Sequence, residues 1–158
     1  MEKLGVKICC VLAVLLFTLL IPLAQATPPT TAEGTWTYTQ AITSARYADG
    51  NLILTVTENR VWIGTFEGTS APDVIRGVIH SNGKLTFDGL INFEGTVGTA
   101  SGTLVIHVSG RGTLSEFYGQ WVILSGAGGL ANLRGQGAFS LEGPNVVQYT
   151  GQIHFELD

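Results

Sequence analysis

The sequence predicts an all-β domain, an antiparallel sheet of about eight or nine strands that closes into a barrel. Short runs rich in Thr, Val, Ile and aromatic residues lie between turn signals. No segment of ten or more residues carries a helical period free of glycine. Asn-Gly and Asp-Gly pairs between the runs indicate short connections, which join antiparallel neighbours because parallel strands need long crossovers.

Residues 1–26 are predicted to be a secretory signal peptide. Lys3 and Lys7 supply a positive start, residues 8–21 are an apolar stretch broken by one threonine, and 24–26 read Ala-Gln-Ala, a small-residue cleavage pattern. An uncleaved membrane anchor is the alternative, but this stretch is shorter than the roughly 20 residues of a spanning helix. We therefore expect an exported protein, periplasmic or secreted, without membrane attachment after cleavage.

Cysteine content and charge exclude several function classes for the mature chain. Cys9 and Cys10 both lie in the predicted signal, so no disulfide, thiol nucleophile or cysteine metal site is expected. Loss of Glu2, Lys3 and Lys7 reduces the 8 basic and 12 acidic residues to 6 and 11, and the formal charge changes from −4 to −5. A chain without a basic run is not expected to bind nucleic acid or an anionic membrane surface.

The mature chain is predicted to be a short tether, 27–33, followed by one barrel domain, 34–158. The clearest strand is 84–95, where apolar residues and glycine alternate with polar residues, and the same period of two recurs at 149–158. The candidate strands are 34–42, 51–57, 60–69, 74–80, 84–95, 102–109, 116–125, 134–141 and 149–158.

Turn residues and glycines within strands predict that the sheet closes. Asp49-Gly50 and Asn82-Gly83 supply the positive φ angles of tight hairpins, and Gly143-Pro144-Asn145 marks the final turn. A sheet of this length exposes its edges unless it curls shut, and closure into a barrel removes them. Glycines such as Gly89 and Gly151 suit the sharp bends of a small barrel.

The stretch Gly126-Ala127-Gly128-Gly129-Leu130-Ala131 follows a strand-like run and matches the G-x-G-x-x-A start of a dinucleotide-binding fingerprint. Such a site needs a helix directly after its glycines to hold the pyrophosphate. Only residues 130–133 could be helical before the next glycines, so we interpret the stretch as a turn between two strands and predict no cofactor. Leu130 and Leu133 are expected to close one end of the barrel.

The segment G-x-G-x-L-A-x-L-R-G-x-G at 126–137 is the most specific pattern of the chain. It is preceded by GTFEGTS, by F-x-G-L and by Gly95-Thr96 with the strand TLVIHVSGRG, and it is followed by Y-x-G-x-I-x-F. Together these segments, which span about 34–158, resemble a family of small bacterial proteins of unknown function grouped with the allene oxide cyclase-like barrels. The resemblance implies an eight-stranded antiparallel closed barrel, allene oxide cyclase-like, but neither a reaction nor site residues.

Glu67 is the candidate catalytic residue. The tetrapeptide FEGT occurs twice and contains Glu67 and Glu94, which could act as an acid–base pair on neighbouring strands. Glu94 lies on the polar face of its strand and is expected to face solvent. Glu67 shares its face with Val61 and Ile63, so it is the candidate for a carboxylate inside the barrel with a raised pKa.

No histidine metal site and no serine nucleophile is predicted. The histidines are far apart in the sequence, and no H-x-H, H-E-x-x-H or G-x-S-x-G pattern is present. His107 and His154 are interpreted as outer-face residues of their strands, and His80 precedes a turn.

The sequence leaves three function classes open, because an eight-stranded barrel is either filled by side chains or just wide enough for one small ligand. The first, which we favour, is a non-catalytic module that holds a small apolar molecule in the barrel or at its mouth. Its candidate ligand-binding residues are Gly126, Gly128, Leu130 and Leu133 at the rim. The second is an isomerase or cyclase for a small hydrophobic substrate, with Glu67 as the catalytic candidate. The third is a structural or interaction barrel that assembles as a homo-oligomer.

Overall fold

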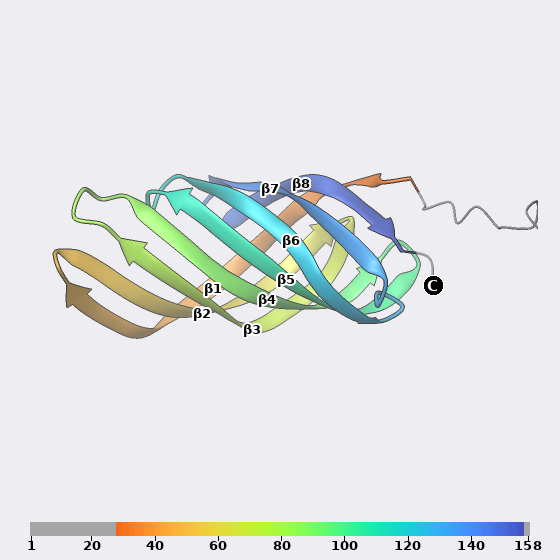
Figure 1. Cartoon of the computed structure of the whole chain (residues 1–158), viewed down its shortest axis with the longest axis horizontal. Helices are drawn as coiled ribbons and strands as arrows, with labels where there is room; N and C mark the ends of the chain where they lie inside the picture. The colour runs from red at the N-terminus through yellow and green to blue at the C-terminus, as the bar shows by residue number, and fades with distance from the viewer. Residues whose placement is uncertain (1–27, 157–158) are drawn as a thin grey trace, which may run out of the picture.

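Eight antiparallel strands close into a barrel in the computed structural model of the chain, which describes residues 28–156 (Figure 1). Each strand pairs with the next, and β1 pairs with β8, so the predicted all-β, eight-stranded closed barrel is confirmed. The predicted signal peptide lies outside the described residues. Within them, no helix is long and apolar enough to cross a membrane. The strands are β1 (Thr30–Ala48), β2 (Asn51–Gly64), β3 (Phe66–Ile79), β4 (Leu85–Val97), β5 (Ala100–Gly112), β6 (Phe117–Gly128), β7 (Leu133–Gly143) and β8 (Val146–Phe155).

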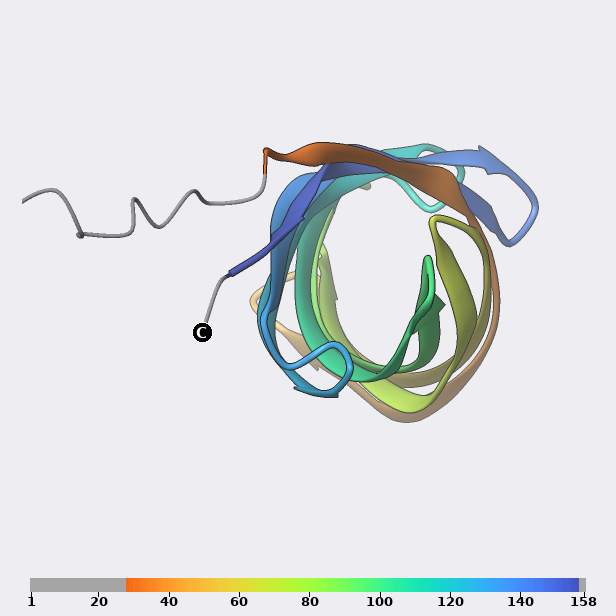
Figure 2. The same ribbon diagram turned by 90° about the vertical axis from the view of Figure 1, so that its right-hand side faces the viewer.

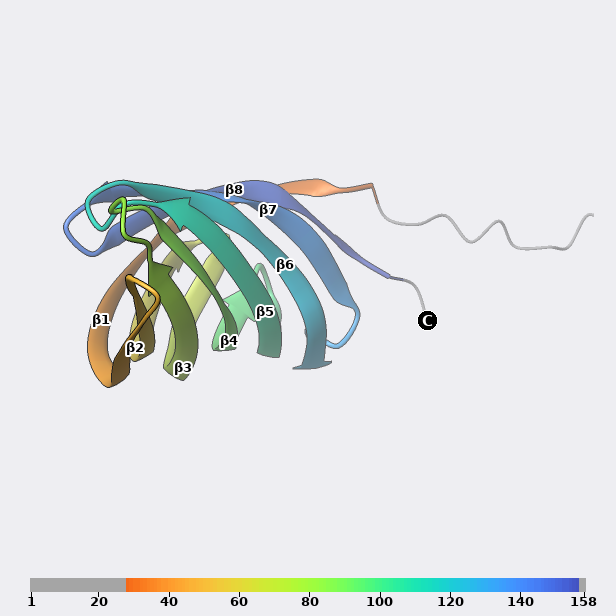
Figure 3. The same cartoon turned by 60° about the vertical axis from the view of Figure 1, so that its left-hand side comes forward.

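The turns divide between the two ends of the barrel. Those that join β1 to β2, β3 to β4, β5 to β6 and β7 to β8 lie at one end, which we call the β1–β2 end (Figures 1 and 3). The other three turns lie at the opposite end, the β6–β7 end, which Figure 2 shows facing the viewer. The two ends differ in how their inner residues are buried.

Two predicted boundaries are wrong because bulges lie inside strands where the sequence indicated breaks. The predicted strands 51–57, 60–69 and 74–80 form two strands, β2 and β3, which meet at a turn beside Gly64, whose φ is +117°. The pairing of β3 with both neighbours shifts register around Pro72, which the sequence indicated as an edge or bend. A bulge adds a residue and bends a strand without ending it.

The predicted tether 27–33 is wrong in its second half. Thr30 pairs with Ile153 and Glu33 pairs with Thr150, so residues 30–33 form the start of β1. Ala32 has no exposed surface. Pairing with β8 closes the ring and draws these residues into the barrel wall.

The glycine-rich stretch forms a turn, as interpreted, and no helix follows it. β6 runs through Gly128, residues 129–132 form the turn, and β7 begins at Leu133. The N–H of Ala131 donates to the carbonyl of Gly128 at 3.2 Å, and that of Leu133 donates to Leu130 at 3.1 Å. Leu130 and Leu133 are both 0% exposed, so the expectation that they close this end is confirmed.

Positive φ angles occur at the predicted hairpins. Asp49 and Gly50 have φ of 50° and 78°, which the tight turn between β1 and β2 requires. At the turn between β3 and β4 the positive angle belongs to Gly83, at 77°. Asn145, at 60°, makes the final turn.

Aromatic rings fill the interior of the barrel. The centroids of ring pairs among the buried members lie 4.6 to 6.5 Å apart. Glycines make room for them: a Cβ on Gly137 would lie 2.7 Å from Cε2 of Trp121, and one on Gly151 would lie 2.4 Å from Cζ2 of the same indole. The indole N–H donates to the carbonyl of Thr150 at 3.2 Å. The rings, each at most 4% exposed, are Trp36, Trp62, Phe66, Phe93, Trp121, Phe139 and Tyr149.

Candidate functional site

A buried ion network lies inside the barrel on β2 and β3. Arg60 pairs with Glu58 and with Asp73, and the side chains of Arg60 and Asp73 are 4% and 0% exposed. Asp73 also accepts hydrogen bonds from Oγ of Ser70 at 2.6 Å and from the backbone N–H of Asn92 at 2.8 Å. Buried charges are costly unless they are paired and hydrogen-bonded, and the carboxylate of Asp73 is both.

The bulge around Pro72 turns Asp73 into the barrel. Side chains alternate between the two faces of a strand, so one extra residue reverses which positions point inward. On β3, Ser70 is buried before the bulge, and Asp73 and Ile75 are buried after it. The reversal brings the hydroxyl of Ser70 and the carboxylate of Asp73 together, three positions apart.

Burial raises the pKa values of two groups at this network. Burial raises the pKa of the Glu58 carboxyl, while Arg60 opposes the shift and Asp73 adds to it. Burial also raises the pKa of the Tyr38 hydroxyl, with Glu58 adding to the shift and Arg60 opposing it. One guanidinium stands between two carboxyl groups, and its Nε has no hydrogen-bond partner among the described residues.

Half-buried apolar side chains line the inside of the barrel from this network toward the β1–β2 end. They occupy inward positions and pack against the core, and we call them the mouth ring: Tyr38, Val56, Phe87, Phe117 and Leu141. The rings of Phe87 and Phe117 meet edge to face with centroids 5.4 Å apart. Glu58, whose side chain is 11% exposed, is the least buried member of the ion network. Apolar surface and a partly exposed carboxyl therefore occur together at this end.

The predicted rim residues lie at the opposite end, where the barrel is closed. Leu130 and Leu133 are fully buried, Gly126 is half-buried, and Gly128 is exposed in the turn with φ of +67°. A ligand could contact the two leucines only after the turn moved. The mouth ring offers half-buried apolar surface without such a movement.

The lumen position expected for Glu67 is wrong. Glu67 and Glu94 are both exposed on the outer faces of β3 and β4. The apolar neighbours on the face of Glu67 are themselves outward, since Val61 is 50% and Ile63 is 62% exposed. The deeply buried carboxyl of the barrel is that of Asp73.

The histidines lie on separate strands or turns, as expected. The Nε2 of His80 lies 3.2 Å from Oγ1 of Thr86, and His107 and His154 are half-buried on β5 and β8. Among residues 28–156, no three His, Cys, Asp or Glu side chains gather in a way that could hold a metal ion.

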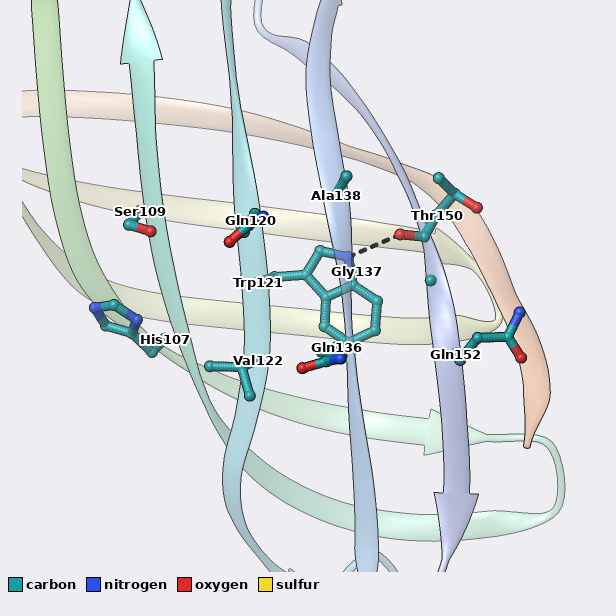
Figure 4. Close-up of a pocket in the computed structure, with 11 residues that line it drawn as sticks. His107, Ser109, Gln120, Trp121, Val122, Gln136, Gly137, Ala138, Thr150 and Gln152 are labelled. Carbon is teal, nitrogen blue, oxygen red and sulfur yellow. Dashed lines mark hydrogen bonds between the residues drawn. The ribbon is translucent and has the colours of Figure 1, made fainter. Parts of the chain in front are cut away.

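A shallow groove of about 640 Å³ crosses the outer wall over β5, β6, β7 and β8 (Figure 4). Gln120, Gln136 and Gln152 extend into it from three neighbouring strands, and His107 and Ser109 line it from β5. Its residues are separate from the ion network and from the mouth ring.

Sequence reasoning missed Arg60 and Asp73. A signal for Arg60 was present, because it occupies the same strand face as Trp62, two positions away, where an unpaired charge is not expected. Asp73 gave no such signal, because its direction depends on the bulge and on which strands lie beside it.

Comparison with known proteins places the chain within one family. The family model described as a protein of unknown function (DUF3224) matches residues 32–152. A protein of unknown function from the DUF3224 family of Shewanella oneidensis MR-1 has a similar structure, with a TM-score of 0.71 at 19% identity, over 83% of this chain and 100% of that chain. An enzyme from Penicillium herquei is similar with a TM-score of 0.53 at 15% identity, over 81% of this chain and 97% of that one. At these identities both structures establish the fold alone. No curated protein matches the chain.

Proposed function

We propose, from the premise that the chain belongs to the DUF3224 family of proteins of unknown function, that it is an exported module which holds a small apolar molecule at the mouth of its barrel. The observation that carries this proposal is the mouth ring. Its residues pack on the core yet are only partly buried, whereas the interior beyond them is filled by rings and the other end is closed by two leucines. Apolar surface with a few polar groups beside it is typical of small-molecule sites.

The chemistry of the mouth favours a ligand with an apolar body and a hydrogen-bonding group. Val56, Phe117 and Leu141 supply apolar surface, and the Tyr38 hydroxyl and the Glu58 carboxyl supply polar contacts. We also propose an allene oxide cyclase-like relationship, which a barrel fold shared with an enzyme supports.

Titration with N-phenyl-1-naphthylamine, a neutral apolar fluorophore, tests binding at the mouth. Val56→Lys places a charge in the mouth ring, and Val61→Lys makes the same change on the outer face of the same strand, where Val61 is 50% exposed. We expect saturable binding that Val56→Lys weakens about tenfold or more and Val61→Lys leaves unchanged. Absence of saturable binding, or equal effects of the two variants in proteins with cooperative melting, would contradict the proposal.

An isomerase or cyclase acting on a small hydrophobic substrate is a second candidate. The observation that favours it is Glu58, a carboxyl whose pKa burial raises, beside Tyr38 at the mouth. Such a group could accept and return a proton. Native mass spectrometry of protein purified under mild conditions would identify a retained molecule. If the Glu58→Gln variant converted the retained molecule to product as fast as the wild type does, a catalytic role of Glu58 would be excluded. The binding proposal would still hold in that case.

The same mass spectrum tests the third function class, a structural or interaction barrel that assembles as a homo-oligomer. A clean mass without adduct, at a multiple of the monomer, would favour that third class over ligand binding. The filled interior is compatible with it.

A further inference from the structure

Three shallow grooves on the outer wall join into one trough, which we call the outer trough. The groove of Figure 4 shares Ser109, Gln120 and Ala138 with a second groove of about 540 Å³. It shares His107 with a third groove of about 240 Å³ that begins at Val74 on β3. Shared lining residues make the trough continuous across the wall from β3 to β8.

The trough crosses the strands instead of following them. A row of outward residues, each paired in register with the next, forms its length: Val74, Leu90, His107, Val122, Gln136 and Gln152. Six strands leave five spacings, and at about 4.8 Å each the row is roughly 24 Å long around the wall. A linear molecule several units long therefore fits this length better than a compact one.

The central part of the trough carries no fixed charge, and uncharged polar side chains line it together with apolar ones. Apart from His107 its lining contains no ionisable side chain, and Arg111 lies in the second groove, with Arg76 and Asp88 in the third. A site for phosphate or carboxylate groups would present arginine or lysine at its centre. A neutral occupant is favoured.

Several polar side chains in the trough have free hydrogen-bonding capacity. Within residues 28–156, those of Ser109, Gln120 and Gln136 make no hydrogen bond with another residue, whereas Gln152 donates to Thr31 at 3.3 Å. An amide both donates and accepts, and so does a sugar hydroxyl.

The recurring modes of peptide recognition do not match this surface. Strand addition needs a free strand edge, but here Val122 pairs with Gln136 and Gln136 pairs with Gln152. Helix docking needs an apolar groove, polyproline binding needs an aromatic-lined one, and phosphopeptides need an arginine cluster. The central part has no arginine, its one aromatic side chain, Trp121, is only 3% exposed, and its apolar residues Val122 and Ala138 each pair in register with a glutamine.

We propose that the outer trough binds a neutral, linear oligosaccharide. Its hydroxyl groups contact the amides of Gln120 and Gln136 and the hydroxyl of Ser109, and its chain runs along the trough with its central units over β5 to β8. This site is independent of the mouth ring, because the two share no residue.

The test is a titration of the full chain with cellohexaose, xylohexaose, maltohexaose, mannohexaose and chitohexaose, followed by amide chemical shifts in NMR spectra. The variant is Gln120→Ala combined with Gln136→Ala, two exposed side chains whose loss leaves the core intact. The matched control is Gln148→Ala, an exposed glutamine of β8 that lines none of the three grooves.

We expect at least one hexasaccharide to bind saturably at millimolar concentration, with shifts concentrated in β5 to β8. Two lost hydrogen bonds should weaken that binding about fivefold or more, and the control should leave it unchanged. The proposal is overturned if no hexasaccharide binds, if the shifts fall outside the trough, or if the double variant binds as the wild type does. Binding of a neutral peptide such as a Gly-Ser-Gln repeat in the trough, without any hexasaccharide, also overturns it.

Discussion

Replacing Arg60 with methionine removes the cation that both Glu58 and Asp73 contact inside the barrel. Methionine fills a similar volume with apolar atoms, so the change tests charge more than cavity formation. Asp73 would keep its hydrogen bonds from Ser70 and Asn92 but would lose its counter-charge in a position with 0% exposed surface.

The expected loss is large because one partner of a buried pair stays behind uncompensated. Breaking such a pair costs about 3–5 kcal/mol of unfolding free energy. For a domain of this size, that corresponds to a fall in Tm of roughly 10–25 °C. Replacing Asp73 with asparagine as well removes the stranded charge, so the double variant should be more stable than the sum of the single losses predicts by about 1–3 kcal/mol.

Urea unfolding followed by tryptophan fluorescence measures these values, because Trp62 and Trp121 are buried in the same core. The cycle comprises the wild type, Arg60→Met, Asp73→Asn and the double variant. A cost below about 1 kcal/mol for Arg60→Met, or strictly additive single effects, would refute the reasoning that Arg60 compensates a buried carboxylate.

Two further predictions concern the closed end and the pH dependence of stability. Leu130→Ala should lower the unfolding free energy by about 2–5 kcal/mol in urea titrations, because Leu130 is 0% exposed; a loss below about 1 kcal/mol would mean that the turn does not close the barrel. The raised pKa of Glu58 means that the folded state favours the protonated carboxyl. The protonated carboxyl therefore contributes to the unfolding free energy below pH 4.5, the usual pKa of the group. This contribution is lost as the pH rises through the folded-state pKa. The stability of the wild type relative to Glu58→Gln should therefore fall from below pH 4.5 to neutral pH in unfolding titrations, and a constant or rising difference would contradict the direction of the shift.

The strand pattern could be predicted because it depends on local rules. The period of two at 84–95 and the Asp-Gly pair at 49–50 are readable from adjacent residues, and both have the expected structure in β4 and in the first hairpin. The error around Pro72 has a physical reason. A proline followed by a polar residue is as typical of a bulge as of a strand end. Only the pairing of β3 with β2 and β4 distinguishes the two possibilities.

The candidate site was harder to predict, since a side chain's environment depends on elements distant in the sequence. Glu67 has apolar neighbours at alternate positions, yet that face points outward. The contacts of Asp73 come from residues 3 to 19 positions away, and a single bulge sets its direction. Alternation shows which residues share a face but not which face is the inner one when both carry apolar residues.

By itself the sequence determined the class of fold: strands, hairpins and the turn at 126–132 follow from side-chain period and from residues that accept positive φ. Tertiary structure alone decided that aromatic rings fill the interior, that the mouth ring stays half-buried, and that Arg60 meets Asp73. The physical reason is that closure of the ring brings all eight strands around one axis. Burial, ion pairing and the outer trough then depend on register between strands, which no local segment encodes.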